Sequence, residues 1–285
     1  MNWMKHLSIY FLISSLIIVP GIYSLVRYGF KPSIEFTGGT RLTIENTISS
    51  PDIILQSFEE YTPSLEDSTP NSVTLKTKNI SQDTAQKAID TLKKDNPEIK
   101  ITGFESIGAA LGKETIKKTI SALIIASVML LLYISFAFKQ LKYGVCALIA
   151  MFHDTIVLLG SFSLLGHFFG VEIDLLFVTA VLTILSFSVH DTIVVFDRIR
   201  ELSHKNKGIE YVTLVNQAVT ETMVRSLNNS LTIIFMLIAL FLIGGETTKF
   251  FSLALLIGTV TGTYSSTFTA APLLIVWNNI FAKNR

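Results

Sequence analysis

Charged residues are scarce in this 285-residue chain, at 16% of positions against roughly 25% in soluble globular proteins. This deficit, together with a hydrophobic fraction of 49%, argues against an ordinary soluble enzyme. Neither sign of charge is in excess, because 23 Lys and Arg face 22 Asp and Glu. The chain therefore lacks the basic surplus that is typical of nucleic-acid binding, and we expect no nucleic-acid partner.

Cysteine is also nearly absent, and histidine is scattered along the chain. The single Cys146 lies inside an apolar run, so neither an intrachain disulfide nor a cysteine-based zinc site can form. The 5 histidines are too far apart in the sequence to indicate a metal cluster. The sequence thus predicts neither a metal nor a cofactor.

Long apolar runs dominate the sequence instead. A helix needs about 20 mostly apolar residues to cross a hydrocarbon core roughly 30 Å thick. Six segments meet this requirement, so we expect an α-helical polytopic membrane protein with six transmembrane helices. The segments are residues 7–26, 119–138, 144–166, 175–196, 227–245 and 250–277.

The first apolar segment could be a signal peptide, because Lys5 precedes it. The apolar stretch continues to Val26, however, and the following Arg27-Tyr28-Gly29-Phe30 offers no small-x-small cleavage site. An uncleaved anchor is therefore the better interpretation, and it divides the chain into three parts. They are an N-terminal anchor helix over residues 1–26, an exported domain over residues 27–118 and a five-helix membrane domain over residues 119–285.

The distribution of Lys and Arg predicts the orientation, because short cytoplasmic loops hold the positive excess. With the N-terminus inside, the short loops on the far side contain only Lys249. We therefore expect both termini to be cytoplasmic and the segment from Arg27 to Lys118 to be exported. The cations on the inner side are Lys5, Lys139, Lys142, Arg198, Arg200, Lys205, Lys207, Arg225, Lys283 and Arg285.

The exported segment alternates between periods of two and of 3.6 residues, which predicts a small α+β domain. The order β-α-β-α-β resembles a ferredoxin-like sandwich, placed between the first and second transmembrane helices. The strand candidates are Ile34 with Phe36, Leu42 with Ile44, Val73 with Leu75, and Ile99 with Ile101, with a bend at Gly38-Gly39. The helix candidates begin at Ser50-Pro51, followed by Ile54, Phe58 and Tyr61, and at Ser81, followed by Ala85, Ala88, Ile89 and Leu92.

Ionisable residues inside apolar spans are expensive, so each is a functional candidate. Those in this chain are Asp154, Asp191 and Arg225, with His153 and His190 directly before the two acids. The pentapeptide His-Asp-Thr-Ile-Val occurs twice, at residues 153–157 and 190–194, in neighbouring helices of opposite direction. A chance repeat in an apolar background is the alternative explanation.

Depth follows from the helical rise of about 1.5 Å per residue, which places Asp191 ~10 Å inward from Arg198 and Asp154 ~18 Å inward from Lys142. Arg225 begins the fifth span and can extend inward, so an ion pair with Asp191 is geometrically possible. Such a pair either holds helices together or loads and unloads a proton at Asp191. His190 or His153 could extend a proton relay, or serve only as helix contacts.

The sixth apolar segment is unusually rich in hydroxyl groups. Gly258 and Gly262 form a GxxxG step that permits close approach of helices. The hydroxyls either bond to their own backbone or form a polar lining for water beside the acids. They belong to Thr259, Thr261, Thr263, Ser265, Ser266, Thr267 and Thr269.

Motifs along the whole chain resemble the SecF proteins, membrane subunits of the bacterial protein-export machinery. Two features depart from that pattern: His190 stands where the family usually has Asn, and Ala109 where it usually has Pro. The motifs are Phe36-Thr-Gly-Gly-Thr40, Ser106-Ile-Gly-Ala-Ala-Leu-Gly112, Phe152-His-Asp154, Ser188-Val-His-Asp-Thr-Ile-Val-Val-Phe-Asp-Arg-Ile-Arg-Glu201 and Arg225-Ser-Leu-Asn-Asn-Ser230.

The resemblance implies a heterodimer with SecD in the bacterial cytoplasmic (inner) membrane, related to the proton-driven transporters of the RND superfamily. It further implies action on a translocating polypeptide beside the SecYEG translocon, with YajC and YidC as further candidate partners. Asp191 and Arg225 then carry proton coupling, Asp154 and His190 join the relay, and no covalent catalysis takes place, so the protein is not an enzyme. The alternatives are a subunit of an RND-type proton-coupled exporter of small molecules or lipids, and a non-conducting scaffold for SecD.

Overall fold

The computed structural model describes residues 3–45, 51–94, 96–206 and 208–281. The chain forms two compact units, one of Pro32–Ser121 and the other of Met1–Lys31 with Ala122–Arg285. The second unit is helical, and the first contains an antiparallel sheet.

Among the described residues, five helices are long and apolar enough to cross a membrane, which confirms the polytopic helical class. The count of six stays a prediction, because the sixth predicted segment is divided among α9 (Glu246–Ser265), a π-helical turn η3 (Ser266–Ala270) and α10 (Ala271–Phe281). The five are α1 (Leu7–Arg27) with the preceding turn η1 (Trp3–His6), α5 (Ala109–Phe138), α6 (Leu141–Phe169), α7 (Leu175–Lys205) and α8 (Tyr211–Ile243).

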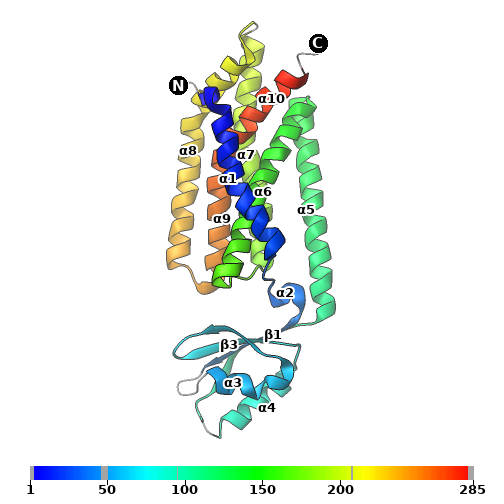
Figure 1. The fold of residues 1–285 in the computed structure, drawn as a ribbon, viewed down its shortest axis with the longest axis vertical. Helices are drawn as coiled ribbons and strands as arrows, with labels where there is room; N and C mark the ends of the chain where they lie inside the picture. The colour runs from blue at the N-terminus through cyan, green and yellow to red at the C-terminus, as the bar shows by residue number, and fades with distance from the viewer. Residues whose placement is uncertain (1–2, 46–50, 95, 207, 282–285) are drawn as a thin grey trace. The chain divides into compact units, whose positions relative to one another are not determined.

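Helices α1, α6, α7, α8 and α9 run side by side (Figure 1). Glycines let two pairs of helix backbones approach closely. A Cβ on Gly21 of α1 would lie 3.2 Å from the Cα of Gly160 on α6, and one on Gly262 of α9 would lie 3.3 Å from the Cα of Ser188 on α7. The predicted close approach at the GxxxG step is therefore confirmed, and the contact between α1 and α6 is an addition to it.

The π turn η3 interrupts the last helical segment directly after Ser265. Pro272 follows at the start of α10. Proline has no backbone N–H and its ring collides with the carbonyl group four residues earlier in a regular α-helix. A turn with one surplus residue avoids this collision, which explains why the helix widens here.

The sheet unit has the element order β-α-β-β-α-β, with the strands arranged as β2-β3-β1-β4 and every neighbouring pair antiparallel. This is the ferredoxin-like arrangement, as predicted. Leu42 on the central strand stands opposite Leu75 on one side and Phe104 on the other. The elements are β1 (Gly39–Glu45), α3 (Pro51–Ser57), η2 (Glu59–Tyr61), β2 (Ser64–Ser68), β3 (Ser72–Thr77), α4 (Gln82–Leu92) and β4 (Lys100–Ile107).

The core of this unit consists of one face of the sheet packed against α3 and α4. Alternate residues of β1 and β3 are buried, so each strand contributes one face. Ile54 and Phe58 from the first helical segment and Ile89 from α4 are fully buried in the same cluster. The helical spacing of these residues thus correctly predicted which side of each helix faces the core.

Three details differ from the prediction. Ile34 and Phe36 are not in a strand but in a short helix, α2 (Ile34–Thr37), because Ser33 caps it by accepting a hydrogen bond from the backbone N–H of Glu35 at 3.3 Å. The edge strand β2 was not predicted, because an exposed strand needs no alternating apolar residues. The first helix ends at Ser57, earlier than expected, while its predicted cap Ser50 lies outside the described residues.

The Gly38-Gly39 bend is confirmed as a turn that only glycine fits well. Both residues have positive φ angles, 72° and 132°, a region that L side chains disfavour. A Cβ on Gly38 would also lie 2.7 Å from the Cα of Ala109, and one on Gly39 would lie 2.7 Å from the carbonyl oxygen of Thr77. The bend thus packs directly against the start of α5.

We predict that Gly112→Ala destabilises the protein while Gly108→Ala does not. A Cβ at position 112 would lie 2.6 Å from the carbonyl oxygen of Phe36, whereas one at position 108 meets only Asn79 Nδ2, at 3.9 Å. The free energy of unfolding should fall by about 2 kcal/mol for Gly112→Ala, since the neighbouring backbone must move. Apparent Tm and cellular abundance of the two full-length variants test this, and equal values would contradict the packing argument.

Candidate functional site

Asp154 of α6 is fully buried between three helices. Its Oδ2 atom accepts hydrogen bonds from the hydroxyls of Ser188 on α7 and Ser265 on α9, each at 2.6 Å. Its Oδ1 atom lies 2.9 Å from Nδ1 of His153, in a hydrogen bond whose direction depends on the histidine tautomer. The carboxyl group therefore joins α6, α7 and α9 at one point.

His153 is the second ionisable group of this cluster, with only 7% of its surface exposed. Its Nε2 atom is buried and has no hydrogen-bond partner among the described residues. Because buried polar atoms are normally paired, an open ring nitrogen beside a buried carboxyl group is unusual. His153 and Asp154 together thus form a buried pair of ionisable side chains.

Asp191 of α7 lies one helical turn beyond Ser188, on the same face of the helix. Asp191 is 3% exposed, and its Oδ2 atom accepts a hydrogen bond from the hydroxyl of Ser226 on α8. Since Ser188 contacts Asp154, the three-residue step puts Asp191 ~4.5 Å farther along α7. Both acids of the repeated pentapeptide therefore face the interior of the helix bundle.

Arg225 and His190, by contrast, are exposed on the helix surfaces. Within the described ranges, Arg225 makes no ion pair, so the structure does not bring it together with Asp191. Its neighbour Ser226 donates a hydrogen bond to the Asp191 carboxyl group instead. The repeated histidines also differ, because His153 faces the bundle interior whereas His190 faces away from it.

Further hydroxyl groups lie between the helices near the two acids. Ser226 and Ser230 lie four residues apart on α8, and Ser230 accepts a hydrogen bond from Thr263 of α9 at 2.6 Å. Thr263 is two residues from Ser265, the donor to Asp154. We call this set the polar seam. Its members are Asp154, Ser188, Asp191, Ser226, Ser230, Thr263 and Ser265.

Of the two expectations for the hydroxyl-rich segment, bonding to its own backbone is confirmed for part of it, and a polar lining for water stays a prediction. Thr259 and Thr261 donate to the carbonyl oxygens of their own helix, at 2.8 and 2.5 Å. Thr263 and Ser265 reach other helices. Sequence reasoning did not select Ser188, Ser226 or Ser230 as site residues, although each lies within one turn of an acid or of another member.

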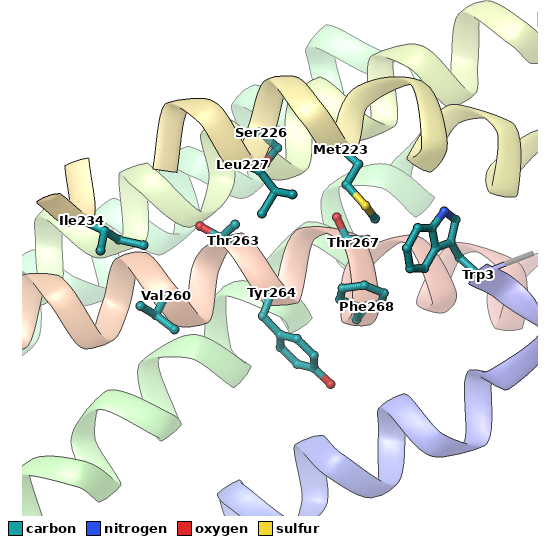
Figure 2. Close-up of a pocket in the computed structure, with 10 residues that line it drawn as sticks. All are labelled: Trp3, Met223, Ser226, Leu227, Ile234, Val260, Thr263, Tyr264, Thr267 and Phe268. Carbon is teal, nitrogen blue, oxygen red and sulfur yellow. The ribbon is translucent and has the colours of Figure 1, made fainter. Parts of the chain in front are cut away.

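A groove of about 420 Å³ opens beside the polar seam. Figure 2 shows residues of α8 facing residues of α9 and η3 across this groove, with Trp3 of η1 at one end. Ser226 and Thr263 belong both to its lining and to the seam. The remaining lining is chiefly apolar and aromatic: Trp3, Met223, Leu227, Ile234, Val260, Tyr264, Thr267 and Phe268.

The chemistry available here is proton exchange. Carboxyl and imidazole groups gain and lose protons, and a hydroxyl can accept a hydrogen bond while it donates another. Within the described ranges, no group of three or more His, Cys, Asp and Glu side chains is arranged to hold a metal ion. The seam contains no cation, so each carboxylate has only neutral or titratable partners.

The sequence matches two models of one protein family. Residues 87–280 match the C-terminal model of the protein export membrane protein SecD/SecF, and residues 23–45 match the SecD/SecF GG motif. The protein translocase subunit SecF of Thermobaculum terrenum is 42% identical, over 95% of this chain and 92% of the relative. That of Anaerolinea thermophila is 36% identical, with the same coverage of both chains.

A solved structure agrees with these relatives. The crystal structure of SecDF from Thermus thermophilus superimposes with a TM-score of 0.85 at 28% identity and covers 98% of this chain. The chain spans only 39% of that longer protein. The SecF resemblance of the sequence motifs is confirmed: the chain belongs to the SecD/SecF family of protein export membrane proteins.

Proposed function

We propose that this SecF-like subunit of Sec protein translocation uses the proton-motive force by passing protons through the polar seam. The observation that carries the proposal is the pair of buried carboxyl groups, Asp154 and Asp191, whose donors from other helices are serine hydroxyls. An ionised carboxylate without a cation is costly inside a membrane. The protonation of each carboxyl group therefore responds to the proton concentration on either side of the membrane.

Protonation of Asp154 would change the contacts between helices. A proton on Oδ2 turns a hydrogen-bond acceptor into a donor, so Ser188 and Ser265 can no longer both donate to that atom without competition. One of the two hydroxyls must turn to another acceptor. Because these hydroxyls come from α7 and α9, the balance between their contacts with α6 shifts with each proton.

The partner in this cycle is SecD. The Thermus thermophilus relative is named SecDF and is far longer than this chain, which supports association with a SecD portion. The pair is related to the RND superfamily and lies in the bacterial cytoplasmic membrane, with both termini cytoplasmic. Residues 27–118 form the exported domain, which acts on the translocating polypeptide beside SecYEG, with YajC and YidC as further partners.

Substitutions of Arg225 test whether the chain couples export to protons or serves only as a scaffold for SecD. Arg225 is exposed on α8 and directly precedes Ser226, so a rotation of α8 would present its guanidinium to Asp191 in place of the hydroxyl. Arg225→Ala should then lower gradient-dependent export about tenfold or more, and Arg225→Lys should retain a larger part of it, because a buried carboxylate that loses its cation costs several kcal/mol.

The measurement is export of a secreted precursor into vesicles containing this chain and SecD, with the proton gradient imposed or collapsed. Lys205→Ala is the matched control, because it removes an exposed cation, paired with Glu201, at the end of α7. Equal export by Arg225→Ala and Arg225→Lys would remove Arg225 from the cycle. Export that never responds to the gradient would favour the scaffold function.

A further inference from the structure

A second cavity, of about 290 Å³, lies where α6 begins, α7 ends and α8 begins. Figure 1 shows these three helix ends at the same end of the helical unit. Its lining contains three basic side chains and no carboxylate of a described residue. The principal hydrogen-bond donors of the lining are Lys142, Arg200, His204, Ser203 and Asn278.

Lys142 contributes a positive charge that no carboxylate neutralises in the described part of the chain. Its ammonium group lies 5.0 Å from the ring centroid of Tyr143 and 5.4 Å from that of Tyr211. The faces of aromatic rings attract cations without cancelling their charge. The two tyrosines therefore hold the ammonium group in place and leave its N–H groups available to an anion.

Arg200 is held by an ion pair, a backbone hydrogen bond and an aromatic ring. Its guanidinium donates to Asp197 at 2.9 Å and to the carbonyl oxygen of Ala137 at 3.2 Å, and it stacks 5.1 Å from the ring centroid of Phe138. A guanidinium has five N–H donors, so these two contacts fix its position and leave others unused. Asp197 is not part of the cavity lining, and so does not occupy the space between Lys142 and Arg200.

The cavity also lies at the boundary between polar and apolar parts of the helices. Lys142 follows Leu141 at the beginning of an apolar span, and Arg200 comes near the end of another. Basic pockets between transmembrane helices at this depth are suited to lipid headgroups. We propose that this cavity binds a phosphate group, carried by the headgroup of an anionic phospholipid. Free phosphate offers the same chemistry, and the experiment below separates the two sources.

The experiment measures binding to the purified full chain by native mass spectrometry. Phosphatidylglycerol is compared with phosphatidylcholine of the same acyl chains, and inorganic phosphate is added as a competitor. Preference for phosphatidylglycerol that survives excess phosphate assigns the site to the lipid. Phosphate binding that displaces this lipid assigns it to the free anion. Equal binding of both lipids, with no binding of phosphate, would overturn the proposal.

Variants of the basic residues localise the binding. Lys142→Gln and Arg200→Gln should each weaken it about fivefold, as expected for the loss of one cation near a membrane surface. Lys142→Arg should retain it. Lys139→Gln is the control, since Lys139 is exposed close by and does not line the cavity. The same loss for Lys139→Gln as for Lys142→Gln would mean unspecific attraction and would contradict a built site.

Discussion

Asp191→Asn is expected to abolish the gradient-dependent component of protein export while the protein accumulates normally. Asparagine has the same shape as aspartate, and its side-chain oxygen can still accept the hydrogen bond that Ser226 donates. It cannot gain or lose a proton at physiological pH. The variant therefore separates the proton-carrying role of Asp191 from its contact with α8.

This result is measured as export of a secreted precursor, with the gradient imposed or collapsed and the variant's abundance determined in the same membranes. Asp90→Asn is a suitable control, since it makes the same chemical change at an exposed position in the sheet unit. Unchanged gradient-dependent export by Asp191→Asn would leave Asp191 with a structural role. The chain would then be better explained as a scaffold for SecD.

Two substitutions of Asp154 should separate its role in export from its role in folding. Asp154→Ala removes the acceptor of two serine hydroxyls and the partner of His153 at once, so we expect destabilisation by about 3 kcal/mol and a marked loss of protein. Asp154→Asn preserves an oxygen for the hydroxyls and an amide for His153. We expect this variant to accumulate and yet to lose gradient-dependent export at least about tenfold.

Abundance and export, measured together for both substitutions, distinguish the two roles. Ser265→Ala is the companion variant, because it removes one of the two donors to Oδ2 and leaves the carboxyl group in place. Its effect on export should be clearly smaller than that of Asp154→Asn. Wild-type export by Asp154→Asn would mean that Asp154 serves only to join α6, α7 and α9.

The acids of the site could be predicted from sequence because their cost in a membrane depends little on tertiary detail. An aspartate inside an apolar run is costly in a membrane whichever way its side chain faces, so it indicates a function. The partners could not be predicted in the same way. Ser188 and Ser226 are ordinary in a transmembrane helix, and only the packing of α7 against α6 and α8 brings them to Asp154 and Asp191.

The structure pairs Asp191 with Ser226 and not with Arg225 for a related reason. The helical rise gives depth along each span, but the rotation of one helix relative to its neighbour depends on contacts between them. Ser226, one residue farther along α8, points about 100° away from Arg225 around the helix axis and takes the inward position. Depth alone therefore could not decide between the two residues.

In the sheet unit, apolar periodicity predicted the buried elements but not the exposed ones. Ile54 and Ile89 face the core as the spacing indicates. The edge strand β2 carries little of that signal, since only Leu65 among its residues is apolar and that side chain is exposed. The alternation of Ile34 and Phe36 has the period of a strand, and the prediction was wrong because the cap at Ser33 starts a short helix there.

The π turn between α9 and α10 is a point at which the last helical segment can rotate about its own axis. Ser265, just before the turn, is bonded to Asp154, whereas Leu274 and Ile275 beyond it are fixed in the bundle core. Returning the surplus residue to α geometry would rotate one side against the other by about 100°. The donor to Asp154 could thus be withdrawn while α10 stays packed, and faster hydrogen exchange at the amides of residues 266–270 under a proton gradient would reveal that rotation.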